Sequence, residues 1–161
     1  MTRLEHLLYR SYELLTKPVV TAPPSGSPTG VPEDPYGAVS DAVRVVKEVY
    51  NLQCQHTMLI NLMYGRVSQP DLFEFVAEEV GIPHKASELL CLHWAEFPNL
   101  SEMKTLTTLL GCSKARISRI YRKVCIMLDE MRSDALHELN IYMRQRNWYN
   151  QIMYSTFILP K

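Results

Sequence analysis

Residues 102–128 read EMKTLTTLLGCSKARISRIYRKVCIML, and this stretch decides how the chain is interpreted. Its first half has leucines at helical spacing, its middle holds Gly111, and its second half repeats apolar residues every three or four positions. The pattern predicts a helix, a tight turn and a second helix. The second helix opens with positive charges and no negative one, and these are Lys114, Arg116, Arg119, Arg122 and Lys123.

The small residues of this stretch suit a helix-turn-helix motif. Ser101 and Ser113 have side chains that cap helix N-termini. Gly111 stands where the turn needs a left-handed backbone, and Cys112 is small and apolar enough to fill the gap between the two helices. The residues expected to face the core are Leu106, Leu109 and Leu110 in the first helix, and Ile117, Ile120, Val124, Leu128 and Met131 in the second.

The outward face of the second helix is predicted to bind DNA, because a basic helix after a turn and a support helix can lie in the major groove. Arg119 and Lys114 are the candidates for guanine edges. Arg122 and Lys123 lie further along and are expected to hold phosphates. The alternative is a solvated amphipathic helix in a bundle. The predicted DNA-binding residues are Ser113, Lys114, Ala115, Arg116, Ser118, Arg119, Arg122 and Lys123.

The charge of the whole chain is balanced, but its distribution is not. The 161 residues carry a formal net charge of zero, which argues against a uniformly basic coat protein for nucleic acid. Residues 71–102 nevertheless hold seven acids and one base, whereas residues 103–123 hold six bases and no acid. We expect one face that attracts phosphate and another that repels it, a distribution that leaves an acidic surface for a different partner.

Residues 86–132, read as ASELLCLHWAEFPNLSEMKTLTTLLGCSKARISRIYRKV followed by CIMLDEMR, resemble region 4 of primary bacterial sigma factors. The resemblance covers about a third of the chain and implies a sigma-region-4-like helix-turn-helix that binds double-stranded DNA. One departure is Thr107, where such motifs usually hold alanine or another tiny residue. The upstream part of the chain does not look like a sigma factor.

In size and motif type the chain resembles the short class of lambdoid phage late-gene antitermination proteins, the Q class. This resemblance implies a transcription regulator that binds DNA near a late promoter and engages a paused bacterial RNA polymerase, with or without its sigma factor. It would then travel with the enzyme and suppress termination. Two alternatives stay open: an activator or repressor of initiation, and a polymerase-binding module that binds no DNA itself. Self-association on DNA also stays open.

The remaining segments predict an all-α protein in three parts. Residues 1–17 form an N-terminal helical arm, residues 18–35 form a linker that contains six prolines, and residues 36–161 form a helical body with the helix-turn-helix at 101–131. The arm either packs back on the same domain or binds another protomer or protein. Within the body we expect helices over 36–64 and 69–80, and another that begins at His84 or Ala86.

The tail, residues 129–161, continues helically and then becomes aromatic at Trp148, Tyr149, Tyr154 and Phe157. It is interpreted as a last core element, with a protein interface or a contact to nucleic acid as alternatives.

Sequence patterns for other functions are weak or missing. The four cysteines form no Cys-x-x-Cys pair and are interpreted as buried and reduced. Cys54/His56 and Cys91/His93 are i, i+2 pairs, which point apart on a helix, so no metal or other cofactor is expected. No phosphate loop or nucleophile elbow is found, and we expect no enzyme. Charges in the first twenty residues argue against a signal peptide, which favours a soluble protein of the cytoplasm, that of a host bacterium if a phage encodes it.

Overall fold

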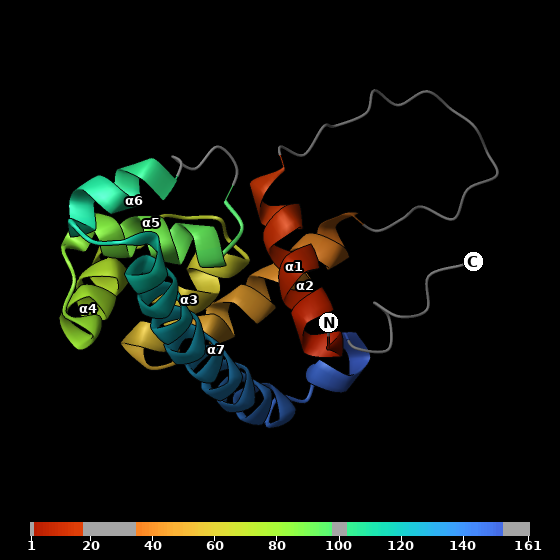
Figure 1. Ribbon diagram of the computed structural model, residues 1–161. Helices are drawn as coiled ribbons and strands as arrows, with labels where there is room; N and C mark the ends of the chain where they lie inside the picture. The colour runs from red at the N-terminus through yellow and green to blue at the C-terminus, as the bar shows by residue number, and fades with distance from the viewer. Residues whose placement is uncertain (1, 18–34, 98–102, 153–161) are drawn as a thin grey trace, which may run out of the picture. The chain divides into compact units, whose positions relative to one another are not determined.

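The computed structural model describes residues 2–17, 35–97 and 103–152. All regular secondary structure in these residues is helical, which confirms the predicted all-α class (Figure 1). The chain separates into two compact units. Unit 1 comprises Met1–Asn51 and Leu139–Lys161, and unit 2 comprises Leu52–Glu138.

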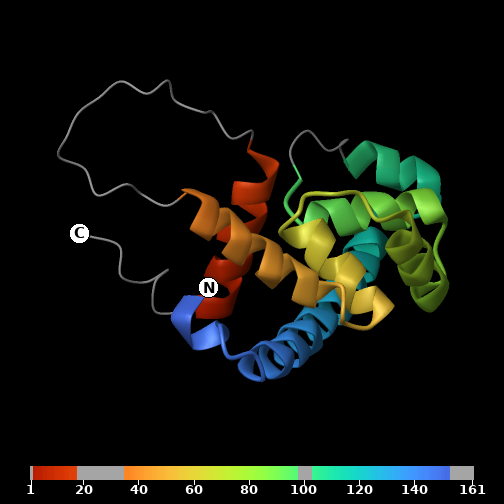
Figure 2. The same ribbon diagram turned by 180° about the vertical axis from the view of Figure 1, so that it is seen from behind.

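The N-terminal segment forms helix α1 (Arg3–Thr16), close to the predicted bounds. A capping box starts it: the Glu5 backbone N–H donates to the Thr2 hydroxyl at 3.3 Å, and the Thr2 N–H donates to the Glu5 carboxylate at 2.6 Å. Helix α1 packs against α2 (Pro35–Val49), and the two lie across each other in both views (Figures 1 and 2). The buried side chains of α1 include Leu4, Leu7, Leu8 and Tyr12. Of the two interpretations of the arm, the structure therefore shows the one in which it packs on its own unit.

The C-terminal part of unit 1 adds its own core residues. Leu139 and Met143 on α7 (Lys114–Arg144) are fully buried, and Tyr149 and Ile152 follow in a short helical turn. The Arg146 guanidinium donates to both carboxylate oxygens of Glu48 on α2, at 2.8 and 3.1 Å. Residues 139–152 are thus a core element, as one interpretation of the tail predicted. Tyr154 and Phe157 lie outside the described residues.

The prediction of a single helix over residues 36–64 is wrong. Helix α2 ends at Val49, and a new helix, α3 (Cys54–Met63), begins four residues after Tyr50. Asn51 explains the break, because its backbone N–H bonds to the Glu48 carbonyl at 3.1 Å and its side-chain amide bonds to the Glu48 carboxylate at 3.0 Å. By forming local hydrogen bonds of this kind, an asparagine competes with continuation of the helix. The boundary between the two units falls at this break, inside the segment predicted as one body.

Unit 2 contains α3, α4 (Pro70–Val80), α5 (His84–Trp94), α6 (Met103–Leu110) and most of α7. Pro70 occupies the first turn of α4, and Gly81 ends it with a left-handed backbone at φ 74°, so the predicted stop is confirmed. Helix α5 begins at His84, one of the two predicted starts. Its fully buried Ser87 donates a hydrogen bond to the Phe73 carbonyl of α4 at 2.7 Å. The core of unit 2 is formed by Leu59, Leu62, Leu72, Phe73, Val76, Ala86, Leu90, Cys91, Ala95, Leu106, Ile117, Val124 and Leu128.

The cysteines differ in environment, so the prediction that all are buried is wrong. Cys91 is buried, and this burial raises the pKa of its thiol to about 12. Cys54 is exposed because it begins α3 after a break that the sequence pattern did not reveal, and Cys112 and Cys125 are half-buried.

Leu8→Ala should test how firmly α1 is anchored. Leu8 is fully buried, so we expect the free energy of unfolding to fall by about 2–5 kcal/mol. Leu15→Ala on the same helix is the control. The Leu15 side chain is 39% exposed, so its truncation should lower the free energy of unfolding far less. Urea unfolding followed by circular dichroism measures both. Equal small losses would contradict the packing of α1 described above.

Candidate DNA interface

The segment predicted as a helix-turn-helix contains a helix, a turn and a second helix, which are α6, Gly111–Ser113 and the start of α7. Gly111 has φ 56°, and its N–H donates to the Thr107 carbonyl at 3.0 Å, which closes α6. The Ser113 hydroxyl accepts from the Arg116 backbone N–H at 3.4 Å, and the Ser113 carbonyl accepts from Ile117 at 3.0 Å. The left-handed glycine and the Ser113 cap are therefore confirmed. The cap predicted at Ser101 lies outside the described residues.

The inner side of the motif packs as the apolar spacing predicted. Leu106 on α6 and Ile117, Val124 and Leu128 on α7 are buried in the core of unit 2. Cys112 is half-buried and packs against the same core, so it fills the turn region as expected. The partly buried members of the two stripes are Leu109, Leu110, Ile120 and Met131.

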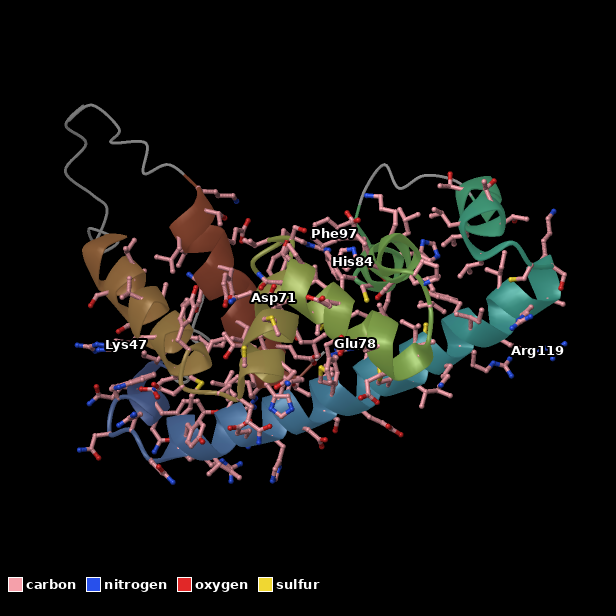
Figure 3. The ribbon with its side chains drawn as sticks, turned by 90° about the vertical axis from the view of Figure 1, so that its left-hand side faces the viewer. Lys47, Asp71, Glu78, His84, Phe97 and Arg119 are labelled. Atoms are coloured by element: carbon pink, nitrogen blue, oxygen red, sulfur yellow. The ribbon has the colours of Figure 1, made fainter. Side chains whose placement is uncertain are left out.

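The outer side of the motif carries every residue predicted to bind DNA. All eight are exposed, and Figure 3 shows Arg119 projecting outward from α7. They are Ser113, Lys114, Ala115, Arg116, Ser118, Arg119, Arg122 and Lys123. Within the described part of the chain, none of the five basic side chains among them forms an ion pair with an acid.

The position of these bases is unfavourable for the helix itself. The first turn of α7 contains no acidic residue, although a helix N-terminus favours negative charge. Lys114 and Arg116 instead add positive charge to the positive end of the helix dipole. The same end, with its backbone N–H groups, is a good place for a phosphate. The basic residues at the start of α7 therefore disfavour the helix by itself but favour the binding of an anion.

The basic surface ends within three turns. Lys123 is followed on the exposed side of α7 by Ile126, which is 53% exposed, and then by Asp129, Glu130 and Asp134. The bases span ten residues, or ~15 Å of helix axis. The sequence interpretation did not single out Ile126, although its spacing from Arg119 and Arg122 already placed it on the outer side.

An acidic surface lies on another helix of the same unit. Asp71, Glu74 and Glu78 are exposed and follow helical spacing along one side of α4, opposite the buried Phe73 and Val76. Figure 3 shows Asp71 and Glu78 on this helix. The two signs predicted from the sequence therefore occupy different helices of unit 2, α4 and the start of α7.

Polar contacts hold α7 against its neighbours in unit 2. His56 at the start of α3 lies 2.6 Å from Glu138, measured from Nδ1 to Oε2. Trp94 on α5 donates from Nε1 to Asp129 at 3.1 Å, and the His93 ring lies 5.3 Å from that of Tyr121. Partial burial raises the pKa of Tyr121 to about 12. The contacts of Asp129 and Glu138 fix α7 beyond the basic surface, so the basic start of α7 belongs to an anchored helix.

Neither a metal-binding cluster nor a membrane-crossing helix is found in the described part of the chain. No three His, Cys, Asp or Glu side chains there are grouped so that they could hold a metal ion. No helix in the same residues combines the length and apolarity needed to cross a bilayer. Comparison of the chain with protein-family models, curated proteins and solved structures finds no match.

Gly111→Ala tests the turn. A Cβ at this position meets no atom within 4 Å, so any cost arises from the left-handed backbone and not from a clash. We expect the free energy of unfolding to fall by about 1–2 kcal/mol. Gly111→Asn is the control and should cost less, because asparagine tolerates this conformation better. Thermal unfolding of the two variants measures the difference, and equal stability would contradict the assigned turn.

Proposed function

We propose that this protein is a sequence-specific transcription regulator that binds double-stranded DNA through the first three turns of α7. The observation that carries the proposal is the set of five exposed basic side chains at the N-terminal end of a well-anchored helix, none of which pairs with an acid among residues 2–17, 35–97 and 103–152. An α-helix fits the major groove, and phosphates would supply the negative charge that the start of α7 lacks.

The residues of this surface would have different roles. Lys114 and Arg119 lie close to the helix start and would reach base edges, where a bidentate contact discriminates by about 1–3 kcal/mol. Arg122 and Lys123 would hold phosphates and fix the register of the helix. Ser113 and Arg116, beside the turn, would contact the backbone of the duplex. Affinity for DNA would therefore fall steeply with salt.

Arg119→Ala and Lys114→Ala test this assignment. The preferred duplex is first selected from a random library with the parent protein, and gel-shift titrations follow. Each substitution should weaken binding to the selected duplex by about 1–3 kcal/mol and relax the preference at one base pair. Lys123→Ala should instead weaken binding to all duplexes by the same factor. It should also reduce the slope of log affinity against log salt concentration by about one.

Lys47→Ala is the matched control for the gel shifts. Lys47 is an exposed base on α2, far from the motif in sequence and in the other unit. Its loss should leave both affinity and sequence preference unchanged. Unchanged binding by the Arg119 and Lys114 variants would overturn the proposed recognition surface.

We further propose that the regulator acts on bacterial RNA polymerase, as a phage late-gene antitermination factor. The support is the resemblance of residues 86–132 to sigma region 4, a module that contacts both promoter DNA and polymerase. The acidic residues of α4 repel phosphate, so they leave a surface of opposite sign for a protein partner. The rival functions are regulation of initiation and polymerase binding without contact to DNA.

Transcription through a terminator separates these functions. The template carries a promoter, the selected duplex sequence and a downstream terminator, and purified bacterial polymerase transcribes it. The expected result is more full-length transcript with the parent protein, and no such increase with Arg119→Ala or on a template without the site. Altered initiation with unchanged termination would favour the initiation regulator. Read-through that is independent of the site would favour the polymerase-binding module.

A further inference from the structure

We propose that two copies of this chain associate through the outer side of α7 in unit 2, antiparallel and centred on Ile126. This pairing covers the basic surface, so the free protein is held in a form that cannot bind DNA. The exclusion of DNA rests on the proposed function, whereas the pairing itself does not. The occupant of the surface is a second copy because the surface is complementary to itself.

Ile126 is the first reason for this inference. It is 53% exposed on a helix whose opposite side contains the fully buried Val124 and Leu128. Arg119, Arg122, Ile126, Asp129 and Ser133 are spaced alternately by three and four residues, which is the spacing of helix-pairing positions. All five side chains are exposed. Ile126 is thus the apolar centre of an outward stripe that the core of unit 2 does not cover.

The order of charges along this stripe is the second reason. Bases precede Ile126 and acids follow it, so the charge reverses at the isoleucine. When a second copy lies antiparallel with Ile126 on the two-fold axis, Lys123 of one copy falls beside Glu130 of the other. Arg122 likewise falls beside Asp129 of the second copy, and each contact occurs twice. A parallel pairing would place like charges side by side.

The groups required for these contacts are available. Arg122, Lys123 and Glu130 are exposed and form no ion pair in the described part of the chain. Asp129 uses Oδ1 to accept from Trp94, and its second carboxylate oxygen is left for the partner. Exposed ion pairs are weak and screened by salt. The pair is therefore expected to form at low salt and to give way to a specific DNA duplex.

This competition would have a regulatory effect. Arg119, Arg122 and Lys123 contact either a second copy or DNA, because both partners use the same side of α7. The antiparallel pair thereby keeps the basic surface from non-specific phosphates until a duplex with sufficient affinity replaces the second copy. Self-association in this form takes place off DNA.

A charge-reversal cycle on one pair tests the proposal. Sedimentation equilibrium at low salt is measured for the parent chain, Lys123→Glu, Glu130→Lys and the variant with both changes. Each single change should weaken association by about tenfold, because two contacts per pair become repulsive. The double variant should return to parent affinity. Failure of the double variant to recover, or a parent chain that stays monomeric up to about 1 mM, would overturn the pairing.

The same variants separate self-association from DNA binding. Glu130→Lys should associate about tenfold more weakly but keep its affinity for the selected duplex, and the double variant should recover association while its DNA binding stays weak. In the parent, added duplex should convert the pair to a DNA complex. A ternary complex in which the pair persists on DNA would overturn the exclusion. Self-association with this pattern in a chain that binds no DNA would support the pairing and reject only the proposed function.

Cysteine cross-linking gives an independent geometric test. Ile126→Cys should form an intermolecular disulfide under mild oxidation, above the background from the native exposed Cys54, because position 126 faces itself across the two-fold axis. Ser133→Cys is the matched control. Its two copies would lie ~21 Å apart along the helix axes and should not cross-link. Equal cross-linking of the two variants would contradict the antiparallel register.

Discussion

The packing of the inner stripe of α7 against the core of unit 2 determines what the rest of that unit can present. Ile117, Val124 and Leu128 are fully buried, and burying such side chains contributes about 1.5–3 kcal/mol each. With these three fixed, the helix cannot rotate about its axis without exposing them. The direction of every outer side chain, from Lys114 to Glu130, follows from this constraint. The polar contacts to His56 and Trp94 add to it further along the helix.

The succession of α6, the turn at Gly111 and α7 was predictable because its determinants are local. A left-handed glycine, a serine cap and apolar residues at helical spacing act within one or two turns, and Gly111, Ser113 and Ile117 all lie where the pattern placed them. The exposure of Arg119 and its basic neighbours follows from the same spacing, since the outer side of an amphipathic helix is defined by the inner one.

The features that sequence reasoning missed depend on long-range or competing interactions. The break at Asn51 sits in a segment whose apolar periodicity continues through it, and only the contacts to Glu48 reveal the turn. The exposure of Cys54 is a consequence of that break. Glu48 and Arg146 could not be paired from the pattern either, because nothing local relates two residues 98 positions apart. The function of the basic surface is likewise an inference from charge and shape, since neither identifies the ligand.

The division of unit 1 between the two ends of the chain has a consequence for synthesis on the ribosome. Helices α1 and α2 emerge early, but Leu139, Met143 and the Arg146 partner of Glu48 follow only after all of unit 2 has been made. At 5–20 residues per second, Arg146 is synthesised about 5–20 s after Glu48. Unit 2 is continuous in sequence and can complete its core first. The nascent chain therefore carries an incomplete apolar surface on its first helices, which makes this interval the period of greatest risk for aggregation and of greatest use for a chaperone.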